Sequence, residues 1–349
     1  MSFLIYGAYG FTGDLIARRA ASHGVKPILA GRDASRLLPL ANELGMEARS
    51  VALDTPPALD DALQDVTAVL HCAGPFIHTA QAMLEACLRT GTHYLDITGE
   101  ISVFEQLAQA DRRAQAAGVM VMPGVGFDVV PTDCLAMHVH QRLPKATQLE
   151  LAIWGRGRPS QGTMRTVVEQ MDMGGAIRRD GRLLRVPSGW RSRTVDFGEG
   201  PMEVVSIPWG DIATAYRSTG MPHITTYARL PDQAQRALRL SDAVSGVLTS
   251  GPVQRLLKNR IAQAPPGPST QEQAQGESFV WAEALADDGT RVEARLHGPE
   301  TYTFTAATAL AAARHVVQGT APPGYQTPAS AFGADFVLNI DGVTREDLV

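Results

Sequence analysis

The sequence predicts an α/β fold, with an N-terminal doubly wound domain on a parallel sheet and a second α+β domain built on a mostly antiparallel sheet. Over residues 1–133, short apolar runs alternate with amphipathic segments, which is typical of β-α-β units. Past about residue 145, short alternating runs are separated by long connections, which favours antiparallel strands. We therefore predict domains at 1–133 and 134–302, and we expect the helices of residues 303–349 to pack back onto the first domain.

The first predicted strand runs into a glycine-rich turn, Gly7-Ala-Tyr-Gly-Phe-Thr-Gly13, and then into a predicted helix over residues 11–22. In dinucleotide sites the first glycine permits the tight turn, the second lets backbone approach the pyrophosphate, and the third lets the helix pack close to the strand. The N–H groups that open the helix then meet the phosphates. The spacing is GxxGxxG instead of the commoner GxGxxG, and the same pattern also suits a strand-to-helix turn without a ligand. We interpret it as a Rossmann cofactor site formed by Gly7, Tyr9, Gly10, Phe11, Thr12 and Gly13.

The residues after the second predicted strand, at 27–30, select the cofactor. An NAD site usually places Asp or Glu here to accept from the ribose 2′-OH, whereas this chain has Gly31-Arg-Asp-Ala-Ser-Arg36. Arg32 can pair with a 2′-phosphate, and Ser35 and Arg36 are near enough to help. In the alternative interpretation Arg32 is a solvated loop charge. We expect Asp33 to cap the next helix in either case, and we favour NADP (NADPH) over NAD.

The remaining elements follow from hydrophobic periodicity and from glycines that end helices. In the first domain we predict helices at 33–44, 78–90 and 102–117 and strands at 48–54, 66–72, 93–97 and 119–122. In the second half we predict strands at 148–154, 204–208, 224–230, 279–286 and 290–297, a polar loop at 262–276, and helices at 306–318 and 327–332.

Ligands of open α/β sheets bind beyond the carboxyl ends of the strands, so we look there for further cofactor residues. Asp54 is well placed to accept from an adenine amino group, although a capping role beside Thr55 and Pro56 fits equally well. The strand at 66–72 leads into four candidates that we expect at the switch point beside the nicotinamide ribose: Cys72, Ala73, Gly74 and Pro75.

The next two strands contribute the other first-domain candidates. Asp96, Gly99 and Glu100 follow the strand at 93–97, and Phe127 and Asp128 follow the strand at 119–122. We expect these residues to border one cleft with Gly74, although a tight turn alone explains Gly126-Phe-Asp128 equally well.

Reduction by a nicotinamide needs a proton source as well as a hydride path. The second domain offers Thr163, Arg165, Asp211 and Tyr216 as catalytic candidates. Tyr216 is the most natural proton donor, but a tyrosine in a predicted strand at 213–216 is also an ordinary packing residue. Arg165 can clamp a substrate carboxylate or lie on a solvated helix face. We expect Thr163 near a helix N-terminus, across the cleft from Gly74 together with Asp211.

The composition and charge limit the classes of partner that we expect. The formal net charge of −5, with no basic run or stripe recognised, argues against a nucleic-acid partner. Neither a signal peptide nor a membrane segment is apparent, so we expect a soluble, cytoplasmic protein. Cys72, Cys87 and Cys134 lack metal-ligand spacing and are expected to be reduced thiols, with no metal bound. We also expect a homodimer formed by the second domain, because antiparallel edge strands need covering.

Together these motifs resemble the saccharopine dehydrogenase-like oxidoreductases, whose relatives include the trans-acting enoyl reductases. The matching pieces are Gly7 to Gly13, Ala30-Gly-Arg32, Cys72-Ala-Gly-Pro75, Gly91-Thr-His-Tyr-Leu-Asp-Ile-Thr-Gly-Glu100, Gly126-Phe-Asp128, Gly162-Thr163, Pro208-Trp-Gly-Asp211, Ser218-Thr-Gly-Met-Pro222 and Thr327-Pro-Ala-Ser-Ala331. The resemblance implies NADP binding and hydride transfer between NADPH and a C=N or C=C bond of a small molecule. The alternative is a non-catalytic NADP-binding scaffold or regulatory protein, because no unmistakable acid/base pair stands out.

Overall fold

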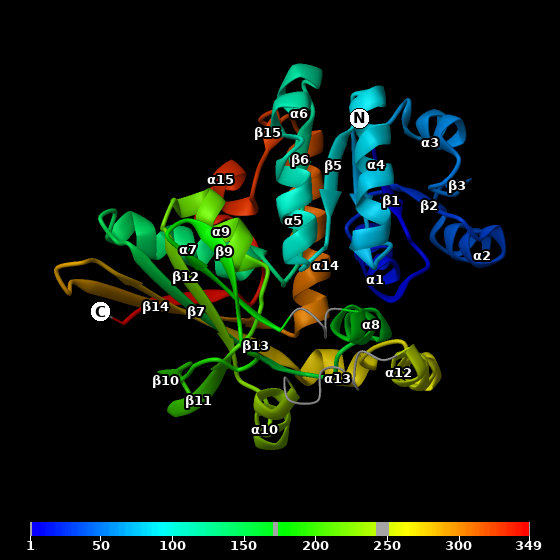
Figure 1. The fold of residues 1–349 in the computed structure, drawn as a ribbon. Coiled ribbons are helices and arrows are strands. Elements are labelled where there is room, and N and C mark those ends of the chain that lie inside the picture. The colour runs from blue at the N-terminus through cyan, green and yellow to red at the C-terminus, as the bar shows by residue number, and fades with distance from the viewer. Residues whose placement is uncertain (1, 170–173, 242–250, 349) are drawn as a thin grey trace. The chain divides into compact units, whose positions relative to one another are not determined.

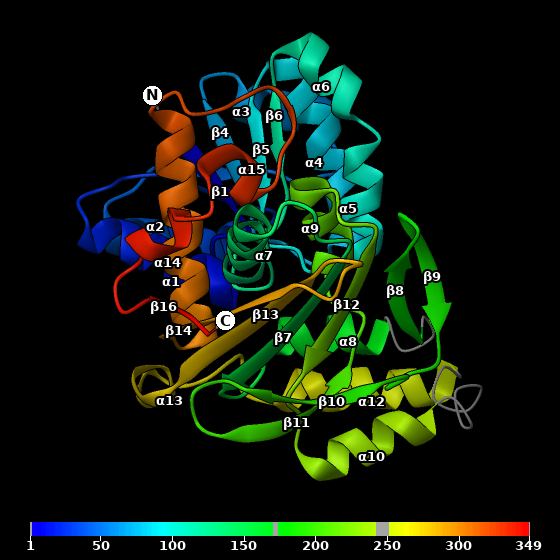
Figure 2. The same ribbon diagram turned by 90° about the vertical axis from the view of Figure 1, so that its left-hand side faces the viewer.

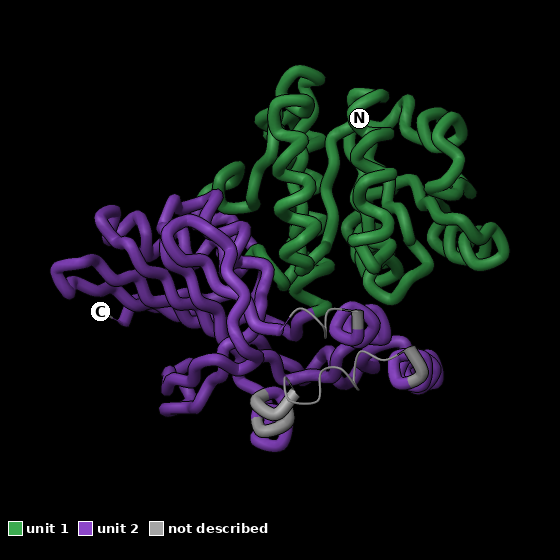
Figure 3. Tube along the Cα trace, in the orientation of Figure 1, with its two compact units in different colours: residues 1–130, 302–333 green, residues 131–301, 334–349 purple. Residues whose placement is uncertain are grey.

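The structure is a computed structural model that describes residues 2–169, 174–241 and 251–348. The chain forms two compact units, one of residues 1–130 and 302–333 and the other of residues 131–301 and 334–349 (Figure 3). Residues 334–349, which the sequence analysis assigns to the first domain, belong to the second unit. The reason is that their strand β16 (Thr344–Asp347) pairs with β14 (Arg291–Pro299) of that unit.

The first unit contains a seven-stranded sheet in the order β15-β6-β5-β4-β1-β2-β3, in which every neighbouring pair is parallel (Figure 1). The chain winds outward from β1 in both directions, so the predicted doubly wound fold is confirmed. The strands are β1 (Phe3–Tyr6), β2 (Ile28–Gly31), β3 (Ala48–Ser50), β4 (Ala68–His71), β5 (His93–Asp96), β6 (Met120–Met122) and β15 (Gly324–Tyr325).

Helices cover both faces of this sheet (Figures 1 and 2). Alternate strand residues such as Leu4, Tyr6 and Val69 share one apolar core with residues of α3, α4, α5 and α6. Fully buried residues of α1 and α14, such as Ile16 and Leu310, belong to the other face. The helices are α1 (Phe11–Ser22), α2 (Ala34–Leu44), α3 (Pro56–Leu63), α4 (Phe76–Thr90), α5 (Ile101–Ala108), α6 (Asp111–Ala117), α14 (Thr301–Val317, whose first residue belongs to the second unit) and α15 (Pro328–Phe332).

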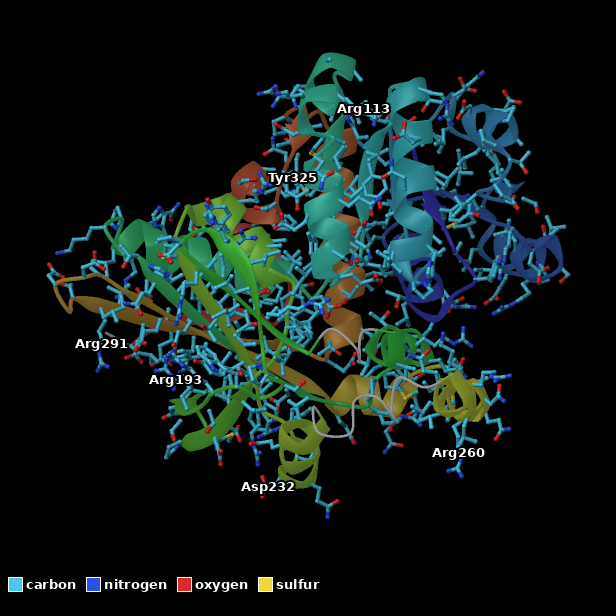
Figure 4. The ribbon with its side chains drawn as sticks, viewed as in Figure 1. Arg113, Arg193, Asp232, Arg260, Arg291 and Tyr325 are labelled. Atoms are coloured by element: carbon cyan, nitrogen blue, oxygen red, sulfur yellow. The ribbon has the colours of Figure 1, made fainter. Side chains whose placement is uncertain are left out.

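Three details of the first unit differ from the prediction. The helix predicted at 102–117 is two helices, because α5 ends at Ala108 and α6 begins at Asp111. The third strand ends at Ser50, not at residue 54. The short strand β15, which holds Tyr325 (Figure 4), was not predicted. The backbone N–H of Tyr325 donates to Asp111 at the start of α6.

The second unit is built on a sheet in the order β10-β11-β12-β7-β13-β14-β16, to which β8 and β9 add through β12 (Figure 2). Its neighbours are antiparallel except β12 and β7, so the predicted mostly antiparallel sheet is confirmed. The strands are β7 (Gln148–Arg156), β8 (Gly175–Arg179), β9 (Arg182–Val186), β10 (Ser192–Asp196), β11 (Pro201–Ser206), β12 (His223–Ala228), β13 (Glu277–Leu285), β14 and β16.

The helices of this unit are α7 (Val130–Arg142, which begins at the last residue of the first unit), α8 (Gln161–Glu169), α9 (Asp211–Thr219), α10 (Asp232–Ser241), α12 (Gly251–Gln263) and α13 (Thr270–Gln275). A single 3₁₀ turn, η2 (Phe336–Asn339), precedes β16. Helix α13 lies within the segment predicted as a loop. It forms because Ser269 and Glu272 make a complete capping box, in which each side chain accepts from the other residue's backbone N–H.

One face of this second sheet carries an aromatic cluster. Trp154 of β7 stacks on Phe279 of β13 with ring centroids 4.7 Å apart. Phe197, just beyond β10, lies 5.9 Å from Trp154, and Asp196 beside it is 3.7 Å from the Arg295 guanidinium of β14. The sheet therefore coils so far that its β10 edge closes over its own central strands.

Candidate functional site

The β1–α1 turn has the geometry that its glycines predict. Gly7 has φ +82°, and a Cβ there would lie 2.9 Å from the Ala73 backbone N. A Cβ on Gly13 would lie 2.3 Å from the Gly7 carbonyl oxygen, so only glycine lets α1 start this close to β1. Gly10 is the N-cap of α1 and offers no side-chain oxygen to the helix. Backbone N–H groups at the start of α1 are therefore left for an external acceptor.

Beyond β2, two arginines and a tyrosine form one cluster. The Tyr9 ring lies against Gly31, where a Cβ would be 2.5 Å from a ring carbon. The Arg36 guanidinium stacks on this ring at 4.7 Å from its centroid and donates to the Tyr9 carbonyl oxygen. Arg32 is exposed and makes no hydrogen bond or ion pair with the described residues. Its charge is available for a ligand phosphate.

Asp33 is the N-cap of α2, as predicted. Its carboxylate accepts from the Ser35 backbone N–H at 3.0 Å and from the Ser35 hydroxyl at 2.6 Å. This hydrogen bonding lowers the pKa of Asp33, whose carboxylate is committed to the helix instead of a ribose. Asp54 is not at a strand end, because β3 stops at Ser50; it lies exposed in the turn before α3 and accepts from the Thr55 hydroxyl.

The loop after β4 is fixed by a buried histidine. Ala73 packs on Gly7, and Pro75 is the N-cap of α4. The Thr79 hydroxyl donates to the Ala73 carbonyl oxygen at 2.8 Å, and His71 Nε2 lies 3.0 Å from the same hydroxyl. Because the hydroxyl proton is already used, His71 donates from Nε2, which leaves Nδ1 unprotonated, buried and without a hydrogen-bond partner among the described residues. Burial lowers the pKa of His71 to about 3, so the ring is neutral at physiological pH. The other loop residues, Cys72 and Gly74, are half-buried and exposed respectively.

Glu100 closes the start of α4 from another direction. Its carboxylate accepts from the Phe76 N–H at 2.8 Å and the Ile77 N–H at 3.0 Å, while the side chain is buried. Pro75 has no side-chain oxygen for this task, so Glu100 supplies the cap from outside the helix. Glu100 thus orders the end of the Gly74-Pro75 loop.

Asp96 links the loops that follow β5 and β6 by hydrogen bonds. Its carboxylate, with no exposed surface, accepts from the Tyr94 hydroxyl at 2.6 Å and from the backbone N–H groups of Thr98 and Gly124 at 2.9 Å. Burial raises the pKa of Asp96 to about 7, although these hydrogen bonds oppose the rise. Asp96 orders the loops after β5 and β6, which hold the candidates Gly99 and Asp128.

Asp128 differs from the other carboxylates of the first unit. It is half-buried beside Gly99, where a Cβ would lie 2.8 Å from Asp128 Oδ2, and it has no hydrogen-bond partner among the described residues. Burial raises the pKa of Asp128 to about 6. Its neighbour Phe127 is buried, with its ring against Phe304 and its N–H bonded to Thr305 of α14. Phe127 therefore anchors the loop, and Asp128 is left with free hydrogen-bonding capacity.

Two of the predicted catalytic residues lie on α8 of the second unit. Thr163 is near the N-terminus of that helix, as predicted, and its backbone N–H donates to the Ser160 hydroxyl at 3.2 Å. Arg165 is exposed on the same helix and makes no hydrogen bond or ion pair with the described part of the chain.

The other two catalytic candidates are held by α9. Asp211, with no exposed surface, accepts from the Thr132 hydroxyl at 2.8 Å and from the Thr214 hydroxyl at 3.4 Å. Tyr216 is in a helix, so the predicted strand at 213–216 is wrong; the short alternating run Ala213-Thr-Ala-Tyr also suits a helix beside a sheet. The Tyr216 ring packs under the Arg178 guanidinium at 4.3 Å, and its hydroxyl lies against Gly181.

NADP fits the first unit on these observations. The bare N-terminus of α1 suits the pyrophosphate, and Arg32 with Arg36 suits a 2′-phosphate. Among the described residues, no group of three or more acidic, cysteine or histidine side chains is arranged to hold a metal ion. None of the described helices combines the length and apolarity needed to cross a membrane. The second-unit candidates belong to a separate unit, and the shared cleft stays a prediction.

Sequence reasoning missed the roles of Thr79 and of the Tyr9–Arg36 stack. Thr79 gave no signal, because a threonine in the first turn of a helix is common. The pair Tyr9 and Arg36 is separated by helix α1 and strand β2, so only the fold brings it together.

Residues 3–122 match the family model of the saccharopine dehydrogenase NADP binding domain. A saccharopine dehydrogenase-like oxidoreductase of Bos taurus is 26% identical over 160 residues, which cover 40% of this chain and 37% of that protein. The trans-acting enoyl reductase of Mycobacterium ulcerans (strain Agy99) is 25% identical over 304 residues, which cover 81% of this chain and 65% of the relative. The matches thus span less than two thirds of either relative's length.

Two solved structures share the fold. Apo saccharopine dehydrogenase (L-Glu forming) from Saccharomyces cerevisiae has a TM-score of 0.69 at 13% identity and covers both chains completely. Homospermidine synthase from Legionella pneumophila in complex with NAD has a TM-score of 0.69 at 9% identity, covering 99% of this chain and 91% of that one. At these identities the likeness shows the fold alone. Residues 3–122 are therefore similar to the saccharopine dehydrogenase NADP binding domain, and the chain as a whole resembles the saccharopine dehydrogenase-like oxidoreductases.

Proposed function

We propose that this protein is an NADP-dependent oxidoreductase that transfers hydride between NADPH and a C=N or C=C bond of a small-molecule substrate. The observation that carries the proposal is the β1–α1 turn. Its three glycines leave the N-terminus of α1 bare, and two arginines that no described carboxylate pairs with follow β2. The family match over residues 3–122 supports the same cofactor. NADPH, when bound, supplies the hydride.

Arg32 and Arg36 are proposed to select NADPH. Titrating the purified protein with NADPH and NADH, followed by nicotinamide fluorescence, tests this. Arg32→Asp should weaken NADPH binding by about tenfold or more and leave NADH binding little changed, because only NADPH carries the 2′-phosphate. Arg112→Gln, an exposed arginine of α6, is the matched control. Equal or tighter NADH binding by the unaltered protein would refute the preference.

Asp128 is the proposed proton donor of the first unit. An acid whose pKa lies near 6 holds a proton for part of the time at neutral pH and releases it readily. Its missing hydrogen-bond partner leaves it able to donate to a substrate atom. Tyr216 and Asp211 are weaker candidates, because packing on Arg178 and hydrogen bonds within the unit already occupy them.

The bond that is reduced separates two substrate classes. The enoyl reductase name of the mycobacterial relative favours a C=C bond, whereas the saccharopine dehydrogenase-like name favours a C=N bond. Turnover of NADPH with a panel of enoyl thioesters, imines and ketones distinguishes them. Saturable NADPH binding without turnover across the panel would instead support the non-catalytic scaffold. Mass spectrometry of a co-purified metabolite narrows the panel further.

We also propose a homodimer formed by the second unit. Its sheet ends at β10 and β16, and neither edge has a neighbouring strand among the described residues. Sedimentation at micromolar concentration should give twice the chain mass, and a monomer would contradict the proposal.

A further inference from the structure

Strands β8 and β9 form a ribbon at one side of the second unit (Figure 2). They are joined by Asp180 and Gly181, both with positive φ (52° and 72°), which is the conformation of a tight type I′ hairpin turn. Arg178 fixes the ribbon to α9: its buried guanidinium donates to the Ile212 and Gly181 carbonyl oxygens, each at 2.7 Å. Arg178 therefore attaches the ribbon to the rest of the second unit.

The ribbon and its continuation are basic. Residues 178–193 contain six arginines and one acidic residue, although the chain as a whole carries a net charge of −5. The sequence analysis found no basic run, and on this segment it was wrong. Four of the six are exposed, and their guanidinium groups make no hydrogen bond or ion pair with any residue that the structure describes, although that of Arg191 lies over the Trp190 ring: Arg179, Arg182, Arg185 and Arg191. By contrast, Arg193 bonds to Glu150 and Glu283.

Two of these free cations face each other. The register pairs Arg179 directly with Arg182 across the ribbon. Directly opposed residues share a face, and like charges in this position are destabilising. No described carboxylate relieves the pair, since Asp180 is 3.8 Å from His223 instead. An external anion placed between the two guanidinium groups would relieve it.

The free edge of β9 indicates what kind of anion fits. Among the described residues, strand β9 pairs with β8 alone, and its Leu183 and Leu184 side chains are 37% and 42% exposed. Next to a two-residue turn, hydrogen bonding alternates so that the N–H and C=O groups of Leu183 and Arg185 point away from β8. Only another polypeptide strand can both hydrogen-bond along the free backbone edge of β9 and pack apolar side chains against the two leucines.

A second copy of this chain does not match that edge. In the two-fold antiparallel pairing that its outward-facing groups allow, centred on Leu184, Leu183 would lie opposite the other copy's Arg185, and residues 182–189 of that copy would bring no carboxylate to Arg179 and Arg182. We propose that the β8–β9 ribbon is a docking site for an extended acidic segment of a partner protein, which adds as a strand to β9 and whose carboxylates lie beside Arg182 on the face that it shares with Arg179.

The test uses the full chain and a fluorescein-labelled short peptide of alternating glutamate and valine, followed by fluorescence anisotropy. The peptide should bind saturably, and more weakly as salt rises. The double variant Arg179→Gln/Arg182→Gln should weaken binding by about tenfold or more, while Arg112→Gln in the first unit leaves it unchanged. A peptide with alternate N-methylated residues keeps its charge but loses strand pairing, and it should bind about tenfold more weakly as well.

Three results would overturn the proposal. These are failure of the peptide to bind, an affinity that does not respond to the double variant, and an N-methylated peptide that binds as tightly as the parent. Anionic phospholipid vesicles and a single-stranded oligonucleotide are the competing probes. Tighter binding of either one through the same two arginines would replace the acidic polypeptide by that class of partner.

Discussion

The carboxylates Asp128 and Asp211 show how the two units use their candidate site residues. Both follow a strand and lie near a glycine, and the sequence singles out both. Asp211 is fully buried and accepts from two threonine hydroxyls, whereas Asp128 keeps part of its surface and has no hydrogen-bond partner among the described residues. A buried carboxylate with satisfied hydrogen bonds holds the fold together, and one with free capacity is available to a ligand.

The largest effect is expected at Gly13, where α1 packs close to β1 because glycine has no side chain. Gly13→Ala places a Cβ 2.3 Å from the Gly7 carbonyl oxygen, so α1 must move away from β1. We expect a loss of about 2–3 kcal/mol of unfolding free energy and NADPH binding weakened by about tenfold or more. Urea denaturation and NADPH titration measure the two effects.

Gly24→Ala is the control for that substitution. Gly24 has a positive φ, unlike Gly13, and no atom lies within 4 Å of its Cβ position. It should lose only about 1 kcal/mol, with NADPH affinity unchanged. If both substitutions had the same effect, close packing of α1 on β1 would not be what Gly13 provides.

Replacing Asp128 and Asp211 by asparagine, one at a time, tests the difference between these two carboxylates directly. Asp211→Asn disturbs a buried pair of hydrogen bonds and should cost about 1–3 kcal/mol of unfolding free energy. Asp128→Asn breaks no such bond, so its unfolding free energy at pH 7 should stay within about 0.5 kcal/mol of the unaltered protein or rise. NADPH turnover should fall in Asp128→Asn, once a substrate is known. Equal destabilisation by the two changes would contradict the distinction drawn here.

A pH-dependent comparison tests Asp96. The folded pKa of about 7 lies above the ordinary value of 3.8, so the stability contributed by its protonated form is complete below about pH 4 and is lost as pH rises through 7. The lowered pKa values of buried histidines, such as His71 and His93, act in the opposite direction over part of this range. The diagnostic quantity is therefore the stability difference between the unaltered protein and Asp96→Asn.

Between pH 5 and pH 8 the unaltered protein should lose on the order of 2 kcal/mol more unfolding free energy than Asp96→Asn loses, measured by urea denaturation. Tyr94 faces Asp96 and bonds to it, and the Glu100 charge adds to the raised pKa of Asp96. Asp128→Asn should show a smaller shift centred near pH 6. A flat difference curve for Asp96→Asn would mean that Asp96 stays ionised, held by its three hydrogen bonds.

The first unit was predictable because its elements are local and strongly patterned. The glycine turn, the cap at Asp33 and the helix ends at Gly45, Gly91 and Gly118 are each determined by a few neighbouring residues. The boundaries at Ser50 and Ala108 were missed, because apolar residues continue past the point where tertiary contacts end the element.

The second unit was less predictable because its contacts are distant in sequence. Strand β16 pairs with β14 over about 50 residues of separation, and the alternating run before Tyr216 gives no sign of the helix that it forms. In the sequence, the β8–β9 ribbon and its continuation show six arginines around an Asp-Gly turn. Only the strand register shows that Arg179 lies opposite Arg182.

The smallest expected effect concerns Thr79, which holds the loop after β4 and which neither residue type nor spacing singles out. Thr79→Val keeps the shape of the side chain but removes the acceptor of the His71 Nε2–H and the donor to the Ala73 carbonyl oxygen. His71 would then be buried with neither ring nitrogen bonded. We expect a loss of about 1–2 kcal/mol of unfolding free energy, and NADPH affinity lowered only about two- to fivefold, because Glu100 still holds the start of α4. Thr79→Ser, which keeps the hydroxyl, should restore affinity. Nitrogen-15 chemical shifts of the His71 ring report the tautomer, and a proton on Nδ1 in the unaltered protein would contradict this account of how the loop is held.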